Sequence, residues 1–272
     1  MTDNLVTFDN PPVNEVVLST QFARHSLDDA LVVAEFWPKV RERFPNIERQ
    51  PPIAPATEDF TSPPKQGQLQ VEFGDQPFPQ RYWCTSEPGN DLLQFQQDRF
   101  LVNWRKLDNG VKYPRYPHVR ELFNEFFPVF EEAVSPEKLN VEQCEITYVN
   151  EIEAKPDSGH GHMELSRVLK LFSGPIDLPD LPAPEDTQYQ SRYVLRRGDD
   201  PFGRFYVSAV PGLNTSTNEP IYVVTLLVRG TPPSPDADGA RAFFEDGHDR
   251  IVRTFKEITT DDMHSEWGLR SE

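Results

Sequence analysis

The chain has 272 residues, of which 37% are hydrophobic and 26% are charged, a balance typical of a folded globular protein. Its formal net charge of −17 disfavours non-specific binding to the phosphate backbone of nucleic acids. No run approaches the ~18 apolar residues of a membrane span, and no basic start followed by an apolar core marks a signal peptide, so we predict a cytoplasmic protein without a membrane segment.

The first part of the chain reads as an arm, a strand, a helix and a proline-rich loop. Residues 1–12 form the arm, and alternation over 14–22 predicts a strand. The helix that follows has an apolar stripe that Pro38 interrupts; we place this stripe at Val33, Trp37, Val40 and Phe44. The loop over 45–64 leads to two further predicted strands, 69–73 and 81–87.

A hairpin and a long helix complete the first half. Apolar residues alternate over 92–97 and again over 100–105, which predicts two antiparallel strands with one buried face. From Pro117 the apolar period changes to that of a helix. The stripe consists of Val119, Leu122, Phe123, Phe126, Phe130 and Val134. Pro128 predicts a kink in this helix or its early end.

The second half repeats this order. A strand over 143–152 precedes a short helix that carries Leu165 and Val168, and a second proline-rich loop spans 174–187. Three strands follow, predicted over 191–197, 203–209 and 220–230. The final helix has a stripe of Phe244, His248, Ile251, Phe255 and Ile258, with Asp236 and Asp238 at its N-terminal end.

The repeated order suggests an internal duplication. The first strands of the two halves are separated by the same number of positions as the Ala-Pro pairs at Ala54 and Ala183 in the two proline-rich loops. We therefore predict an α+β fold made from a duplicated β-α-β(3–4)-α unit, with antiparallel sheet and helices on one face. The unit order is that of TATA-binding-protein-like and helix-grip architectures. The units are predicted at 13–140 and 141–272, joined edge to edge.

Several segments resemble a sporadically distributed family of bacterial proteins of unknown function. They are NPPVNEVVLSTQF from Asn10, ERFPNIERQPP from Glu42, LLQFQQDRFLVNWRK from Leu92, KYPRY from Lys112 and QCEITYVNEI from Gln143. The resemblance covers most of residues 10–152, and the remainder matches only in general layout. It implies a bacterial gene of a mobile or strain-variable kind. It brings no established activity, cofactor or catalytic residue.

The sequence holds no motif for common catalytic or nucleotide-binding chemistry. It lacks a phosphate-binding loop, a dinucleotide fingerprint, an H-E-x-x-H pair, a C-x-x-C pair and a nucleophile elbow. His160 and His162 could share a metal ion but have no clear third ligand, so an exposed loop is the favoured interpretation. His248 is interpreted as a core histidine, and Cys84 and Cys144 as buried, reduced thiols. We predict no catalytic residue, no metal and no cofactor.

One basic and aromatic group stands out in this acidic chain. It consists of Arg99, Asn103, Arg105, Tyr113, Arg115 and Tyr116. Arginine and tyrosine are typical anchors of binding interfaces, so the group is a candidate binding site on the open face of the sheet. The alternative is that the arginines pair with acids of the chain and hold the loop in place.

Two functions remain open. The first is a non-enzymatic binding or regulatory protein that engages a protein partner, in a mobile-element or phage-defence context; nucleic acid is disfavoured by the charge. The second is a small-ligand binder or enzyme that uses a pocket between sheet and helices. For that pocket the candidate polar residues are Glu145, Tyr148 and Asn150. The oligomeric state and the identity of any partner are not given by the sequence.

Overall fold

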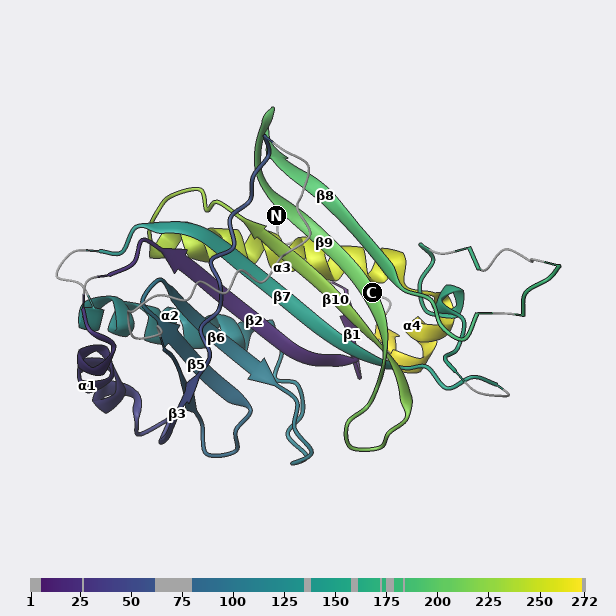
Figure 1. The fold of residues 1–272 in the computed structure, drawn as a ribbon, viewed down its shortest axis with the longest axis horizontal. Coiled ribbons are helices and arrows are strands. Elements are labelled where there is room, and N and C mark those ends of the chain that lie inside the picture. The colour runs from purple at the N-terminus through teal and green to yellow at the C-terminus, as the bar shows by residue number, and fades with distance from the viewer. Residues whose placement is uncertain are drawn as a thin grey trace.

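The fold is built on a large antiparallel sheet with helices packed on one face, which confirms the predicted α+β class (Figure 1). The structure is a computed structural model. It describes residues 6–25, 27–61, 80–134, 138–157, 161–171, 173–174, 179–182 and 184–270. The predicted strand over 69–73 and the residue His160 lie outside these ranges.

Among the described residues, nine strands form the sheet in the order β3–β4–β5–β6–β2–β7–β10–β9–β8. Their bounds are β2 (Val13–Phe22), β3 (Asn46–Gln50), β4 (Arg81–Thr85), β5 (Asp91–Gln96), β6 (Arg99–Arg105), β7 (Val141–Glu153), β8 (Tyr189–Arg197), β9 (Asp200–Leu213) and β10 (Pro220–Gly230). The order is symmetrical about the β2–β7 pair, because each of these two strands has the last long strand of its own half as its other neighbour. The two halves thus share one continuous sheet, joined edge to edge; a common ancestry of the halves stays a prediction.

Helices cover one face of this sheet. They are α1 (Asp29–Val40), α2 (Tyr116–Val134), α3 (Ala237–Ile258) and the short α4 (Asp261–Trp267). In the second half a 3-10 turn, Leu165–Arg167, stands where a short helix is predicted. A separate two-stranded ribbon pairs β1 (Thr7–Phe8) with β11 (Leu269–Arg270), which brings residues from the two ends of the chain together.

The period-2 pattern of each strand decides which side chains meet the helices. In β6, Phe100, Val102 and Trp104 are fully buried on the helix face, while Asn103 and Arg105 belong to the opposite face. The ring of Phe130 in α2 lies at the centre of the aromatic core. It contacts a ring from each of β5, β6 and α1. The predicted hairpin and the stripe of α2 are therefore confirmed.

The two helical prolines are tolerated, contrary to the interruption predicted in the first helix. Helix α1 continues through Pro38 to Val40, and α2 continues through Pro128 to Val134. Pro38 lies on the exposed side of α1, so the carbonyl that loses its partner there faces water. The buried residues of α1 are Val32, Phe36 and Val40, so Val40 is predicted correctly and the other two lie one position before the predicted Val33 and Trp37.

Helix α3 comes unusually close to the sheet at Gly247. A Cβ atom at this position would lie 2.5 Å from Cγ2 of Ile146 in β7, and Ile146 is fully buried. Glycine normally weakens a helix interior by about 0.5–1 kcal/mol relative to alanine. Here its small size is needed, because it lets α3 lie directly on β7 and fixes the height of the next residue, His248, above the sheet.

The face opposite the helices is crossed by residues 51–61, which we call the strap (Figure 1). The proline-rich loop predicted over 45–64 thus begins as the edge strand β3 and continues as the strap. The side-chain amides of Gln96, Gln21 and Gln143, from three strands, hold its backbone at Ile53, Ala56 and Glu58. Because these glutamines replace water as partners, the strap keeps its backbone polar groups satisfied over the sheet.

A buried carboxylate fixes the far end of the strap. The side chain of Glu58 is 3% exposed and pairs with the guanidinium of Arg204. It also accepts a hydrogen bond of 2.6 Å from the Tyr206 hydroxyl, and Arg229 lies 3.6 Å away. Burial, followed by the adjoining Glu58 carboxylate, raises the pKa of Tyr206 to about 12. The strap is therefore attached to β9 and β10 by charge as well as by amide contacts.

Candidate functional site

A cavity of about 420 Å³ lies between the sheet and the helices α2 and α3. We call it the aromatic pocket. Its walls are formed by Val6, Thr7, Phe8, Pro11, Val13, Tyr113, Arg115, Tyr116, Pro117, Tyr148, Asn150, His248, Ile251, Val252, Phe255 and Arg270. The volume falls in the range of small-molecule sites, roughly 300–1,000 Å³. Most of the exposed surface of the wall is apolar.

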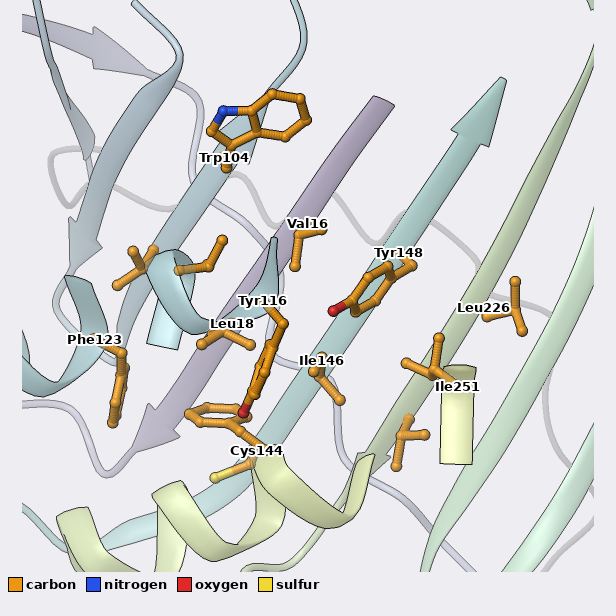
Figure 2. Packing of buried hydrophobic residues seen from close by; sticks show 14 of the residues in the cluster. Val16, Leu18, Trp104, Tyr116, Phe123, Cys144, Ile146, Tyr148, Leu226 and Ile251 are labelled. Carbon is orange, nitrogen blue, oxygen red and sulfur yellow. The ribbon is translucent and has the colours of Figure 1, made fainter. Parts of the chain in front are cut away.

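Three rings form a connected polar cluster in the pocket. The imidazole of His248 lies flat on the ring of Tyr116, with 3.9 Å between the centroids and 10° between the planes. Its Nδ1 atom is 2.8 Å from the hydroxyl of Tyr148. Figure 2 shows Tyr148 on β7 with its hydroxyl directed toward Tyr116, among the buried side chains beneath the helices. Helix and strand residues are thus linked across the pocket by stacking and by a hydrogen bond.

The environment keeps these groups neutral. Burial, assisted by the positive charge of Arg120, lowers the pKa of His248 to about 4. Burial also raises the pKa of Tyr148 and Tyr116 well above the usual value, and it raises the pKa of Tyr113 to about 12. A neutral imidazole with its proton on Nε2 can accept the Tyr148 hydroxyl at Nδ1. The pocket therefore offers neutral donors and acceptors around an apolar space at neutral pH.

The outer wall of the pocket is the β1–β11 ribbon. Phe8 packs edge-on against Phe255 of α3 and Trp267 of α4, with ring centroids 5.9 and 6.0 Å apart. Arg115 donates from Nη2 to the Phe8 carbonyl at 2.7 Å, which ties the ribbon to the start of α2. Arg270 pairs with the carboxylate of Asp9 at 2.6 Å. These contacts hold a short segment of each chain end over the cavity.

The six candidate binding residues divide into two groups of three. Tyr113, Arg115 and Tyr116 line the aromatic pocket, at the point where the basic loop enters α2. The structure brings them together with Tyr148 and Asn150, which are two of the three residues considered for a pocket between sheet and helices.

Arg99, Asn103 and Arg105 lie on the other face of the sheet and bind within the protein. Arg99 donates to the side-chain oxygen of Gln21 at 2.6 Å and to the Ala54 carbonyl of the strap. Asn103 accepts from Gln94 and donates to Glu15, at 2.8 and 2.7 Å. Arg105 donates to the Gly89 carbonyl at 3.0 Å and lies over the ring of Trp83.

Glu145, the third residue considered for the pocket, does not reach it. Its side chain is on the strap face and binds Nε of Arg229 at 2.6 Å. The reason is the period of the strand: Glu145 is an odd number of positions from Tyr148, so the two side chains lie on opposite faces of β7. This correction follows from alternation alone.

Sequence reasoning did not identify the ribbon or the role of His248 in the pocket. The ribbon strands have two residues each, too short for a periodic signal. His248 is on the predicted stripe of the last helix, as expected, but its ring faces a cavity and two tyrosines. The one sequence signal for this role of His248 was its position as a polar ring within the apolar stripe of the last helix.

Other candidate groups have structural contacts. His162 is 2.9 Å from the Gly212 carbonyl through Nε2. Cys84 and Cys144 are buried free thiols, and burial raises the pKa of Cys84 to about 12. In the part of the chain that the structure describes, no three His, Cys, Asp or Glu residues gather closely enough to hold a metal ion.

A scan against family models finds no match to this chain, and searches of curated proteins and of solved structures find none either. The resemblance to the bacterial family described above stays a prediction. Among the described residues, no helix combines the length and the apolar character needed to span a bilayer.

Proposed function

We propose that this protein binds a small, mostly apolar molecule in the aromatic pocket. The observation that carries the proposal is the cavity itself, which leaves about 420 Å³ open between the sheet and the helices α2 and α3. A space of this size with a few convergent polar groups is the usual form of a ligand site.

The polar groups suit recognition rather than a reaction. His248, Tyr116 and Tyr148 are neutral and lie against one another, and Asn150 donates to the Val224 carbonyl of its own sheet. With a pKa near 4, His248 is a weak base at neutral pH and is far from the value that suits a general base there. The proposal is therefore a binding protein, in line with the absence of catalytic motifs in the sequence.

Binding can be measured with the neutral apolar dye Nile red, whose fluorescence increases in apolar surroundings. We expect saturable binding of one dye per chain. Val252→Phe places a larger side chain in the wall of the pocket and should weaken dye binding at least tenfold. The matched control Val210→Phe makes the same change on the exposed surface of β9, where Val210 is 40% exposed, and should leave binding unchanged.

Two results would overturn the proposal. One is the lack of saturable dye binding by the wild type. The other is equal affinity of wild type and Val252→Phe, with thermal unfolding showing that the variant is folded.

A second candidate function is the engagement of a protein partner through strand β8. Within the described residues, β8 has a neighbouring strand on one side only, and its Tyr193 and Val194 are 46% and 47% exposed. An unpaired edge with exposed apolar side chains can accept a further strand. Co-purification of the products of neighbouring genes with wild type but not with Tyr193→Lys would support it. Equal recovery of a partner with wild type and with Tyr193→Lys would exclude β8 as the binding edge.

A further inference from the structure

We infer that the ligand of the aromatic pocket is an apolar molecule with one anionic end, such as a carboxylate, held at Arg115. This inference rests on the proposed small-molecule function and assigns the chemical class of the ligand. Three observations support it: the charge of the pocket wall, the partners of Arg115 and the backbone conformation of that residue.

The wall of the pocket has the opposite charge to the chain as a whole. The chain has 44 acidic and 27 basic residues. The residues of the pocket wall, in contrast, include two arginines, Arg115 and Arg270, and no aspartate or glutamate; the nearby Glu245 carboxylate accepts a hydrogen bond of 3.2 Å from the Tyr116 hydroxyl. An apolar space bordered by positive charge attracts anions, because low-dielectric walls strengthen the field of the nearby cations.

The two arginines differ in their partners. Arg270 is paired with the carboxylate of Asp9, so its charge is neutralised locally. Arg115 instead donates to two backbone carbonyls, those of Phe8 at 2.7 Å and Asp9 at 3.4 Å, both through Nη2. Within the described part of the chain, Arg115 forms no ion pair with a carboxylate. Its remaining N–H groups form a planar fork of the kind that carboxylates bind at two points.

The backbone places Arg115 at the mouth of the pocket in an unusual conformation. Its φ angle is 77°, in the left-handed region that residues with a side chain rarely adopt. Such conformations persist where the surrounding structure holds them and are often associated with function. The residue is exposed to solvent and also lines the cavity, so the guanidinium lies where an incoming ligand would leave water.

The neutral part of the pocket agrees with this orientation. Other groups of the wall, such as Ile251 and the stacked rings of Tyr116 and His248, have no formal charge at neutral pH. An anionic head at Arg115 would leave the apolar body of the ligand against these rings. The reverse orientation would bury a charge without a partner, which is costly.

A matched pair of ligands tests the inference: decanoic acid and decanol, which differ only in the head group, compete with Nile red for the pocket. For wild type we expect the acid to displace the dye about tenfold more tightly than the alcohol at neutral pH. Arg115→Gln should remove this preference, so that acid and alcohol displace the dye with equal affinity. Arg115→Lys keeps the charge and should retain part of the preference. The control Arg250→Gln removes an exposed arginine that pairs with Asp246 on α3, and the preference should persist.

The outcomes separate this inference from the proposed function. Equal displacement by acid and alcohol in wild type overturns the anionic assignment while the pocket still binds the dye. A loss of both affinities in Arg115→Gln, by the same factor, would also overturn it, since the residue would then only support the wall. Absence of dye binding in wild type removes the proposed function and this inference together.

Discussion

The imidazole of His248 lies parallel to the phenol ring of Tyr116, 3.9 Å away, and the two residues come from different helices. Helices α2 and α3 belong to different halves of the chain, so this stack is a contact between the halves as well as a wall of the aromatic pocket. Its chemistry gives the first prediction.

Stability should fall as the pH is lowered through the range in which His248 would titrate. Its pKa in the folded protein is about 4, below the unfolded value of about 6.5, so the unfolded chain binds the proton more readily between these values. Titration of His248 therefore does not affect the free energy of unfolding above pH ~6.5. Near pH 4.5 it lowers that free energy by on the order of 2 kcal/mol.

The measurement is urea unfolding of wild type and His248→Phe between pH 7.5 and 4.5, in steps of about half a pH unit. The phenyl ring keeps the stack on Tyr116 and cannot titrate. Other groups titrate in both proteins, so the informative quantity is the free energy of unfolding of wild type minus that of His248→Phe. This difference should decrease as the pH is lowered. Parallel curves would show that His248 is not held neutral.

Gly247→Ala should destabilise the protein although alanine favours helices. The new Cβ would meet Cγ2 of Ile146 at 2.5 Å, and overpacking of a core costs typically 1–3 kcal/mol against a gain of about 1 kcal/mol in helix propensity. We expect a net loss of about 1 kcal/mol in chemical unfolding. In an Ile146→Ala background the clash is absent, so there the same substitution should be stabilising. The same sign in both backgrounds would contradict the close-approach argument.

Glu58→Gln should destabilise the protein by about 3 kcal/mol, because removing one member of a buried ion pair leaves the other charge uncompensated. The side chain keeps its size, but Arg204, whose side chain is 7% exposed, loses its carboxylate. Chemical unfolding measures the loss. Glu48→Gln, an exposed position on β3, is the matched control and should change stability by less than about 0.5 kcal/mol. Equal effects at the two sites would refute the role given to the strap.

Phe130→Ala should cost about 3–5 kcal/mol, the usual loss for a large aromatic side chain removed from a core. Its ring lies within 5.0 Å of Phe100 and 5.4 Å of Phe36, measured between centroids, so the cavity would be bordered by rings that cannot easily close it. Phe130→Leu should cost less, since most of the volume is kept. Unfolding in guanidinium gives both values, and similar losses for the two variants would show that the site relaxes.

The sequence was informative where a period was long and regular. Alternation in 92–105 and the helical stripes of α2 and α3 predicted elements close to those observed, because one face of each is buried throughout. Strand β3 gave no such signal: it is an edge strand, and none of its five residues is fully buried. The ribbon of β1 and β11 depends on a pairing across nearly the whole chain, which local patterns do not encode.

The same limit applies to the aromatic pocket. Tyr113, Arg115 and Tyr116 could be selected because they form a basic, aromatic segment in an acidic chain. Their association with Tyr148 depends on how β7 pairs with β2, and with His248 on how deeply α3 approaches the sheet. Three of the six residues selected by composition line the pocket, and long-range packing decides which residues share that cavity.

The pairing of β2 with β7 has a consequence for any attempt to divide the protein. Nine positions of β2 are matched to β7 in the middle of the sheet, so a fragment containing either half alone would present a long, unpaired central strand with an apolar face. Such edges are templates for intermolecular association. Each fragment should therefore precipitate when produced separately, and co-expression of the two should restore soluble material.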